Sequence, residues 1–156
     1  GLYAVGVAGV AMGIARGMLD AFIELAQAKA PRNLARMADS PTVQADVARQ
    51  EARFGSARAY LLDIIGDLYE RASDAAPMGI PDRARVRLGT TNAIHAAIEV
   101  ADFVYKAAGV DGIFPGSPYE RRFRDIHTLS QQIQSRGAHF EAVGHILLGG
   151  EPAVFL

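Results

Sequence analysis

Residues 107–151 read AAGVDGIFPGSPYERRFRDIHTLSQQIQSRGAHFEAVGHILLGGE, and signals within this stretch decide the fold. Gly109 is expected to end one helix, because glycine readily takes the left-handed conformation found at helix ends. Ser117 and Glu120 predict a capping box, in which the Ser117 hydroxyl accepts from the Glu120 amide and the Glu120 carboxylate returns to the Ser117 amide. Pro118 suits the first position of that helix. The capping box therefore sets the register of the helix that follows.

The new helix carries the densest group of charges in the chain, residues 120–125. We interpret Arg121 and Arg122 as part of a solvated face. Arg124 and Asp125 lie next to residues that should face inward, so an ion pair with another helix and a catalytic role both remain open. The residues expected to face inward are Tyr119, Phe123, Ile126 and Ile133.

Similar start and stop signals divide the rest of the chain into helices. Ser40 and Pro41 repeat the cap-then-proline pattern, Asp82 can cap a helix after the proline-containing break at 77–81, and Gly149 follows the last helix. We expect helices over residues 2–28, 41–75, 82–108, 118–134 and 139–148. Sustained strand-like alternation is missing. The predicted fold is all-α, an up-down four-helix bundle of long helices with a short C-terminal fifth helix.

Apolar periodicity supplies the core of this bundle. In the second helix apolar residues recur every seven positions with a second row beside them, which is typical of a bundle seam. The third helix has a similar apolar stripe. The expected core residues are Val43, Val47, Phe54, Ala57, Leu61, Ile64 and Leu68 in the second helix and Ile94, Ala97, Ala101, Val104 and Ala108 in the third.

The first helix has an unusual face. Residues 1–15 carry no charge, and Gly9, Gly13 and Gly17 recur every four positions. Such glycines let another helix backbone approach closely, in a membrane or in a soluble bundle. Arg16 ends the uncharged run short of the roughly 20 residues that a membrane span requires. We therefore expect a buried helix of a soluble bundle and no membrane association.

Composition is that of a globular domain. The chain has 156 residues, half of them hydrophobic, and we treat residues 1–156 as one helical domain. A net charge of −1 supplies no field that would recruit nucleic acid. The lack of cysteine excludes disulfides and thiolate metal sites and fits a cytoplasmic protein. Because the chain starts in a helix without an initiator Met, we interpret it as a fragment of a larger protein.

Few residues suggest chemistry on their own. His95 and Glu99, four residues apart, could form half of a metal site. No second pair of ligands accompanies them, so a hydrogen-bonded or exposed histidine is the simpler interpretation. The loop 109–112 has glycines that would let a backbone come close to a ligand, although a helix stop followed by a turn gives the same letters. The residues alone establish only a helical bundle with one glycine loop.

A family resemblance adds to this interpretation. The segments PYERRFRDIHTLSQQI (118–133) and FEAVGHILLG (140–149) resemble the C-terminal domain of the acyl-CoA dehydrogenase superfamily, and within it the two-component flavin-dependent monooxygenases. The resemblance extends over nearly the whole chain. It implies a homotetramer, a flavin cofactor (FAD or FMN) shared with other domains, and a separate flavin reductase as partner.

The resemblance implies that the glycine loop touches the flavin nucleotide of a neighbouring subunit. In the dehydrogenases this loop has the pattern Gly-Gly-x-Gly with a glutamine three residues earlier. Gly109 and Gly112 match two of the glycines. Val110 takes the place of the middle glycine and Lys106 that of the glutamine.

A second implied flavin contact lies where the first helix connects to the second. Gln44 matches a glutamine early in the second helix. Asn33 occupies the place of the family's arginine, and Arg32 stands next to it. The cofactor-binding candidates are therefore Arg32, Gln44, Gly109 and Gly112.

At the catalytic positions the sequence departs from the dehydrogenases. Ile133 stands where the usual catalytic glutamate would be, and Tyr3 near where some members keep their base; isoleucine cannot abstract a proton. Gln132 stands where the monooxygenases often have a histidine facing the flavin. An amide donates and accepts hydrogen bonds but does not titrate. Gln132 is therefore the catalytic candidate, as a holder of a flavin or substrate group, and a polar position inside the bundle is the simpler interpretation.

The leading hypothesis is the C-terminal domain of a flavin-dependent oxidoreductase, a two-component monooxygenase that takes reduced flavin and oxygen and oxygenates a small organic substrate. One alternative is an acyl-CoA dehydrogenase with a displaced base. Another is a non-catalytic helical assembly module whose flavin site has decayed. We expect the isolated chain to be inactive, because the other flavin-enclosing domains of such enzymes are missing.

Overall fold

The computed structural model describes residues 2–32, 34–72 and 78–152. Three helices are long: α1 (Leu2–Ala28), α2 (Pro41–Arg71) and α3 (Ile80–Ala108). Two are short: α4 (Glu120–Ser130) and α5 (Ala138–Leu147). The connections contain the 3-10 turns η1 (Met37–Asp39), η3 (Gly109–Gly112) and η4 (Ile133–Ser135). No strand occurs in these ranges, and the predicted all-α fold is confirmed.

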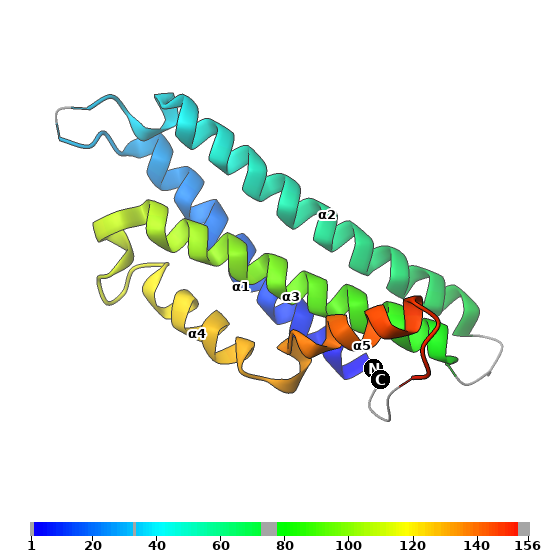
Figure 1. Ribbon diagram of the computed structural model, residues 1–156. Helices are drawn as coiled ribbons and strands as arrows, with labels where there is room; N and C mark the ends of the chain where they lie inside the picture. Colours follow the sequence, from blue (N-terminus) through cyan, green and yellow to red (C-terminus); the bar gives the residue numbers. More distant parts are fainter. Residues whose placement is uncertain (1, 33, 73–77, 153–156) are drawn as a thin grey trace.

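The helices run up and down with α3 at the centre. In Figure 1, α1 and α3 run in one direction, α2 runs back, and α4 and α5 follow one another as the second returning arm. The central helix α3 contacts each of the other four. The expectation of four long helices needs correction, because the fourth arm consists of two short helices joined by η4.

Polar side chains interrupt this fourth arm. Ser130 Oγ donates to the carbonyl three residues before it at 2.6 Å, and Ser135 Oγ donates to the Leu129 carbonyl at 3.2 Å. These hydroxyls compete with backbone amides for the helix acceptors. Gln132 then takes an extended conformation with ψ 154°. As a result Ile133, which was expected to face inward, is 58% exposed, and Leu129 is buried in its place.

The cap of α4 forms only in part. Ser117 Oγ accepts from the amides of Tyr119 and Glu120, each at 3.3 Å, as half of the capping box requires. The Ser117 amide donates instead to the Phe114 carbonyl at 3.0 Å. The Glu120 carboxylate pairs with Arg124 at 2.6 Å. The predicted return bond from Glu120 is therefore wrong, although the hydroxyl still marks the start of the helix.

The core lies where α1, α2 and α3 meet. The five core residues predicted for α3 are all at most 1% exposed. In α2 the centre of the predicted seam is buried, whereas its ends are partly exposed at Val43, Val47 and Leu68. The largest side chains that α1 contributes to the core are those of Met12, Met18, Leu19 and Phe22.

A glycine outside the predicted pattern lies against a core side chain of the neighbouring helix. Gly9 and Gly13 of α1 are exposed, and a methyl group placed on either would meet nothing within 4 Å. The expected close packing of another backbone on these glycines is therefore wrong within this chain. A methyl group on Gly89 of α3, by contrast, would lie 2.6 Å from Ile64 Cδ1 of α2.

Arg16 lies midway along α1, where the uncharged first half of the helix ends. Its guanidinium donates two 2.8 Å hydrogen bonds to Glu51 of α2, approaches Asp20 at 2.7 Å, and lies 5.3 Å from the Phe54 ring centroid. The hydrogen bonds to Glu51 raise the pKa of Arg16 above its usual value. By length and composition α1 could cross a membrane, a property that it shares with the core helices of soluble proteins. Here one face of α1 packs in the core.

Candidate functional site

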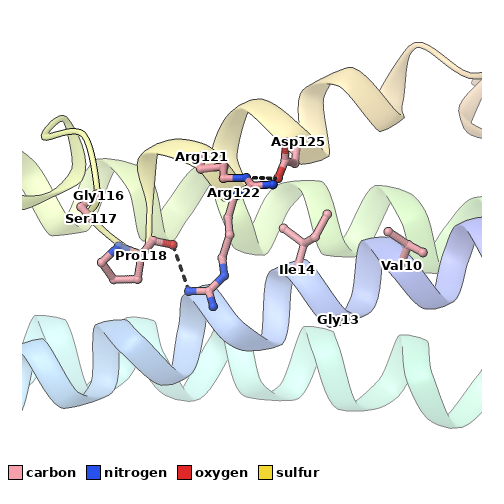
Figure 2. A pocket seen from close by; sticks show the side chains of 9 residues that line it. All are labelled: Val10, Gly13, Ile14, Gly116, Ser117, Pro118, Arg121, Arg122 and Asp125. Atoms are coloured by element: carbon pink, nitrogen blue, oxygen red, sulfur yellow. Dashed lines mark hydrogen bonds and ion pairs between the residues drawn. The ribbon is translucent and has the colours of Figure 1, made fainter.

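A groove of about 640 Å³ runs between α1 and the start of α4. Figure 2 shows its two walls, with small and apolar side chains below and charged side chains above. The loop before α4 forms one end of the groove. The lining residues are Val10, Gly13, Ile14, Gly116, Ser117, Pro118, Arg121, Arg122 and Asp125.

The α1 wall of the groove is smooth and uncharged. Val10 is 57% exposed, and Gly13 has open space where a side chain would stand. Ile14, one residue further along, is partly buried. This wall belongs to the uncharged run of α1, so it offers contact to an apolar or planar ligand and no ionic partner.

The α4 wall carries charges that are satisfied locally. Arg122 extends toward α1, donates to the Pro118 carbonyl at 3.0 Å, and lies against Gly17, so it closes one end of the groove (Figure 2). Arg121 pairs with Asp125 at 3.7 Å, within α4. Arg124 likewise pairs within α4. The suggested ion pair of Arg124 and Asp125 with another helix is therefore wrong.

The glycine turn η3 is firmly built at the end of α3. Gly109 has φ 59° and ψ −130°, a conformation that glycine takes without strain, and it ends α3 as predicted. Gly112 is buried, and a methyl group on it would lie 3.2 Å from the Tyr105 carbonyl. Ser117 Oγ donates to the Gly112 carbonyl at 3.4 Å, which connects the turn to the groove. Val110 points outward and is 58% exposed.

Two further contacts fasten the turn and the groove to the end of α1. The Lys29 ammonium pairs with the Asp111 carboxylate of η3. The hydroxyl of Tyr119, a residue only 3% exposed, donates to the Ala21 carbonyl at 2.8 Å. Burial raises the pKa of Tyr119, and the carboxylate of Asp111 raises it further. Neither contact was predictable from the sequence, because residues so far apart in the chain leave no local spacing signal.

The structure brings the cofactor-binding candidates to one end of the bundle. The connection between α1 and α2 and the turn η3 both lie there (Figure 1). Arg32 is exposed on the connection and Gln44 is exposed in the first turn of α2, where its Nε2 donates to the Ala38 carbonyl at 2.9 Å. Gly109 is exposed at this same end of the bundle, whereas Gly112 is buried. Asn33 lies outside the described residues.

The catalytic candidate lies apart from these residues. Gln132 is at the far end of α4, in the bend before η4, and does not line the groove. It is exposed, so its interpretation as a polar position inside the bundle is wrong. Its neighbour Ile133 and the alternative base position Tyr3 are exposed as well.

The histidines form separate structural contacts. His95 Nε2 lies 2.8 Å from the Ser135 carbonyl, while Glu99 pairs with Arg53 at 2.8 Å, so the two do not act together as half of a metal site. His127 pairs with Asp102 of α3 at 2.7 Å. That pair is not part of the groove lining. Among the described residues no group of three side chains is placed to hold a metal ion.

Comparison with known proteins agrees with this architecture. The family described as "Acyl-CoA dehydrogenase, C-terminal domain" matches residues 5–136. The indole-3-acetate monooxygenase of Pseudomonas putida is 30% identical over 144 residues, which are 92% of this chain and 37% of that protein. The chain thus spans little more than a third of the length of this relative.

Three solved structures share the fold. XiaF from Streptomyces sp., in complex with FADH2 and glycerol, has a TM-score of 0.88 at 23% identity, over 97% of this chain and 39% of that one. The 3-HSA hydroxylase from Rhodococcus sp. RHA1 has a TM-score of 0.83 at 19% identity, over 96% and 40% of the two chains. The HsaA monooxygenase from M. tuberculosis has a TM-score of 0.79 at 20% identity, over the same shares.

These matches confirm the resemblance inferred from residues 107–151. The family model covers most of the chain, including α1, α2, α3, α4 and the groove between α1 and α4. The chain therefore belongs to the family of acyl-CoA dehydrogenase C-terminal domains.

Proposed function

We propose that this chain is the helical C-terminal domain of a two-component flavin-dependent monooxygenase that oxygenates a small aromatic substrate. The observation that carries the proposal is the groove between α1 and α4, which has one smooth uncharged wall and is open to solvent along its length. Such a half-pocket suits a planar, largely apolar ligand that other protein parts would cover. The similarity to an indole-3-acetate monooxygenase supports this class of substrate.

The residues at the glycine-turn end fit a flavin nucleotide. Gly109 presents bare backbone, since nothing lies within 4 Å of where its side chain would be. Arg32 offers an exposed guanidinium for phosphate, and Gln44 an exposed amide. Ile113 and Phe114, each 56% exposed, offer apolar contact for a ring. When bound, a reduced flavin supplies the electrons that activate oxygen; these residues would orient it.

The absence of a base at position 133 argues against acyl-CoA dehydrogenation. Ile133 is 58% exposed in η4, after the end of α4, and has no titratable group. Abstraction of a proton next to a carbonyl needs a positioned base. We therefore favour oxygenation over dehydrogenation. Oxygen uptake and dye reduction distinguish the two reactions.

The first test uses the complete natural polypeptide that contains residues 1–156. With a flavin reductase, NADH and FAD or FMN, we expect oxygen uptake and a hydroxylated product from indole-3-acetate or simple phenols. Reduction of a dye by acyl-CoA thioesters without oxygen uptake would instead identify a dehydrogenase. A protein that binds no added reduced flavin and consumes no oxygen with the reductase would identify a non-catalytic assembly module.

Gln132 can be tested against its neighbour. Its exposed amide in the bend after α4 could hold a flavin or substrate oxygen by hydrogen bonding but could not transfer a proton. We expect Gln132→Ala to lower the product formed per NADH by about tenfold, the scale of one lost transition-state hydrogen bond. Gln131→Ala is the matched control, because Gln131 is also exposed and its side-chain amide donates to Ser130 Oγ, its neighbour in this bend. Equal coupling in the two variants would remove Gln132 from the site.

A further inference from the structure

The two segments that carry the cofactor-binding candidates are joined by one ion pair. Lys29 follows α1, at the start of the connection that bears Arg32, and its ammonium pairs with Asp111 in the glycine turn η3. The two residues are 82 positions apart in the chain. Both side chains are partly buried, at 29% and 39% exposure.

The pair continues a hydrogen-bonded route from Gln44 to the glycine turn. Gln44 Nε2 donates to the Ala38 carbonyl of η1 at 2.9 Å. In the same turn, the Met37 amide donates to the Lys29 carbonyl at 2.9 Å. The Lys29 side chain then reaches Asp111. Each link fixes one segment on the next, and the ion pair is the link that crosses from the α1–α2 connection to η3.

We propose that Lys29 and Asp111 are positioning residues, which hold the glycine turn in register with the α1–α2 connection so that both contact the same flavin nucleotide. The proposal rests on the flavin-binding function proposed above. Without the pair, Gly109 would still end α3, but the spacing between its backbone and Arg32 would no longer be fixed. Binding of a nucleotide would then have to order the turn, and the free energy of this ordering would weaken the affinity.

An electrostatic role and a positioning role of Asp111 predict opposite effects of Asp111→Asn on flavin binding. Asp111 puts a negative charge beside a site for anionic phosphates, and Lys29 neutralises it. If charge alone mattered, Asp111→Asn would strengthen binding, because it removes the repulsive group. If position matters, Asp111→Asn weakens binding just as Lys29→Met does. This variant therefore separates a positioning role from an electrostatic one.

The experiment measures dissociation constants of reduced FAD, titrated anaerobically into the complete natural polypeptide and followed by the flavin's absorbance, with the melting temperature of the flavin-free protein recorded alongside. We expect Lys29→Met and Asp111→Asn each to raise the dissociation constant about five- to tenfold. Lys29→Arg, which keeps the charge and a donor, should bind nearly as the wild type does. The control is Asp82→Asn, which removes a 2.7 Å contact with Arg71 at the opposite end of the bundle and should leave binding unchanged.

Each outcome decides the matter. Weaker binding in both single variants, with melting temperatures like that of Asp82→Asn, supports the positioning role. Tighter binding by Asp111→Asn, wild-type affinity in both variants, or a loss that simply follows lowered melting temperatures overturns it. If the wild type itself binds no flavin, the proposed function fails, and this inference fails with it; variants that bind like a flavin-binding wild type overturn the inference alone.

Discussion

At the scale of single residues, His139 couples the short helix α5 to the centre of the bundle. Its Nδ1 lies 3.3 Å from Oγ1 of Thr91, a fully buried residue of α3. Burial lowers the pKa of His139 below its usual value of 6.5, and the positive charge of Arg87 lowers it further. As pH falls below 6.5, the unfolded chain takes up this proton before the folded chain does, so the free energy of unfolding decreases through that window.

A substitution that cannot titrate should remove this loss. In His139→Asn an amide can still meet Thr91 but takes up no proton. Between about pH 7 and pH 5, the variant should therefore lose less stability than the wild type, measured by urea unfolding at a series of pH values. His145→Asn, on the exposed side of the same helix, is the control and should keep the wild-type pH dependence. Parallel curves for wild type and His139→Asn would contradict the assignment.

At the scale of helices, the contact between α2 and α3 depends on a missing side chain. A methyl group on Gly89 would lie 2.6 Å from Ile64 Cδ1, and Ile64 is fully buried. Gly89→Ala should therefore lower the free energy of unfolding by about 1 kcal/mol or more, because crowding outweighs the gain in helix propensity. Chemical denaturation measures this directly.

A double-mutant cycle identifies the cause. Ile64→Val removes the crowded methyl group and should by itself cost about 0.5–1.5 kcal/mol. If Gly89→Ala crowds Ile64, the double variant should cost less than the sum of the two single variants. Gly66→Ala is the control, because Gly66 is helical and exposed with open space around it, and this variant should gain up to about 1 kcal/mol. Additive costs in the cycle would mean that the glycine serves another purpose.

Some helix ends marked by local chemistry were predictable, whereas α3 begins at Ile80, before its expected cap Asp82, and α4 begins at Glu120, two residues after Pro118. Gly109 ends α3 and Pro41 begins α2, as the sequence indicates. The break after Ser130 was not predicted, because it arises from hydroxyls that bond to carbonyls in the preceding turns, and serine occurs both inside and outside helices. Gly89 was missed for a similar reason, since a single glycine has no period that would reveal its partner.

At the scale of the whole molecule, the candidate residues fall into two groups at opposite ends of α4. The glycine turn and the α1–α2 connection lie at the end of the bundle where α4 begins, and Gln132 follows the eleven residues of α4, about 16 Å of helix further on. The family motif indicated both groups. The groove could not be predicted, because Val10 and Arg122 line the same groove only when α4 packs against α1. Under the proposed function, the separation favours contacts with two flavins, one of them a neighbouring subunit's.

Arg16 has a consequence for how the chain is made. Helix α1 precedes α2 in the sequence, so during synthesis it emerges from the ribosome before Glu51 emerges to pair with its guanidinium. A lone arginine near the middle of an apolar helix costs about 2.5–3.5 kcal/mol on insertion by the translocon, and Asp20 adds a cost of similar size. These two charges would thus disfavour membrane insertion of a nascent segment of this length and composition until α2 has emerged and can pack against it.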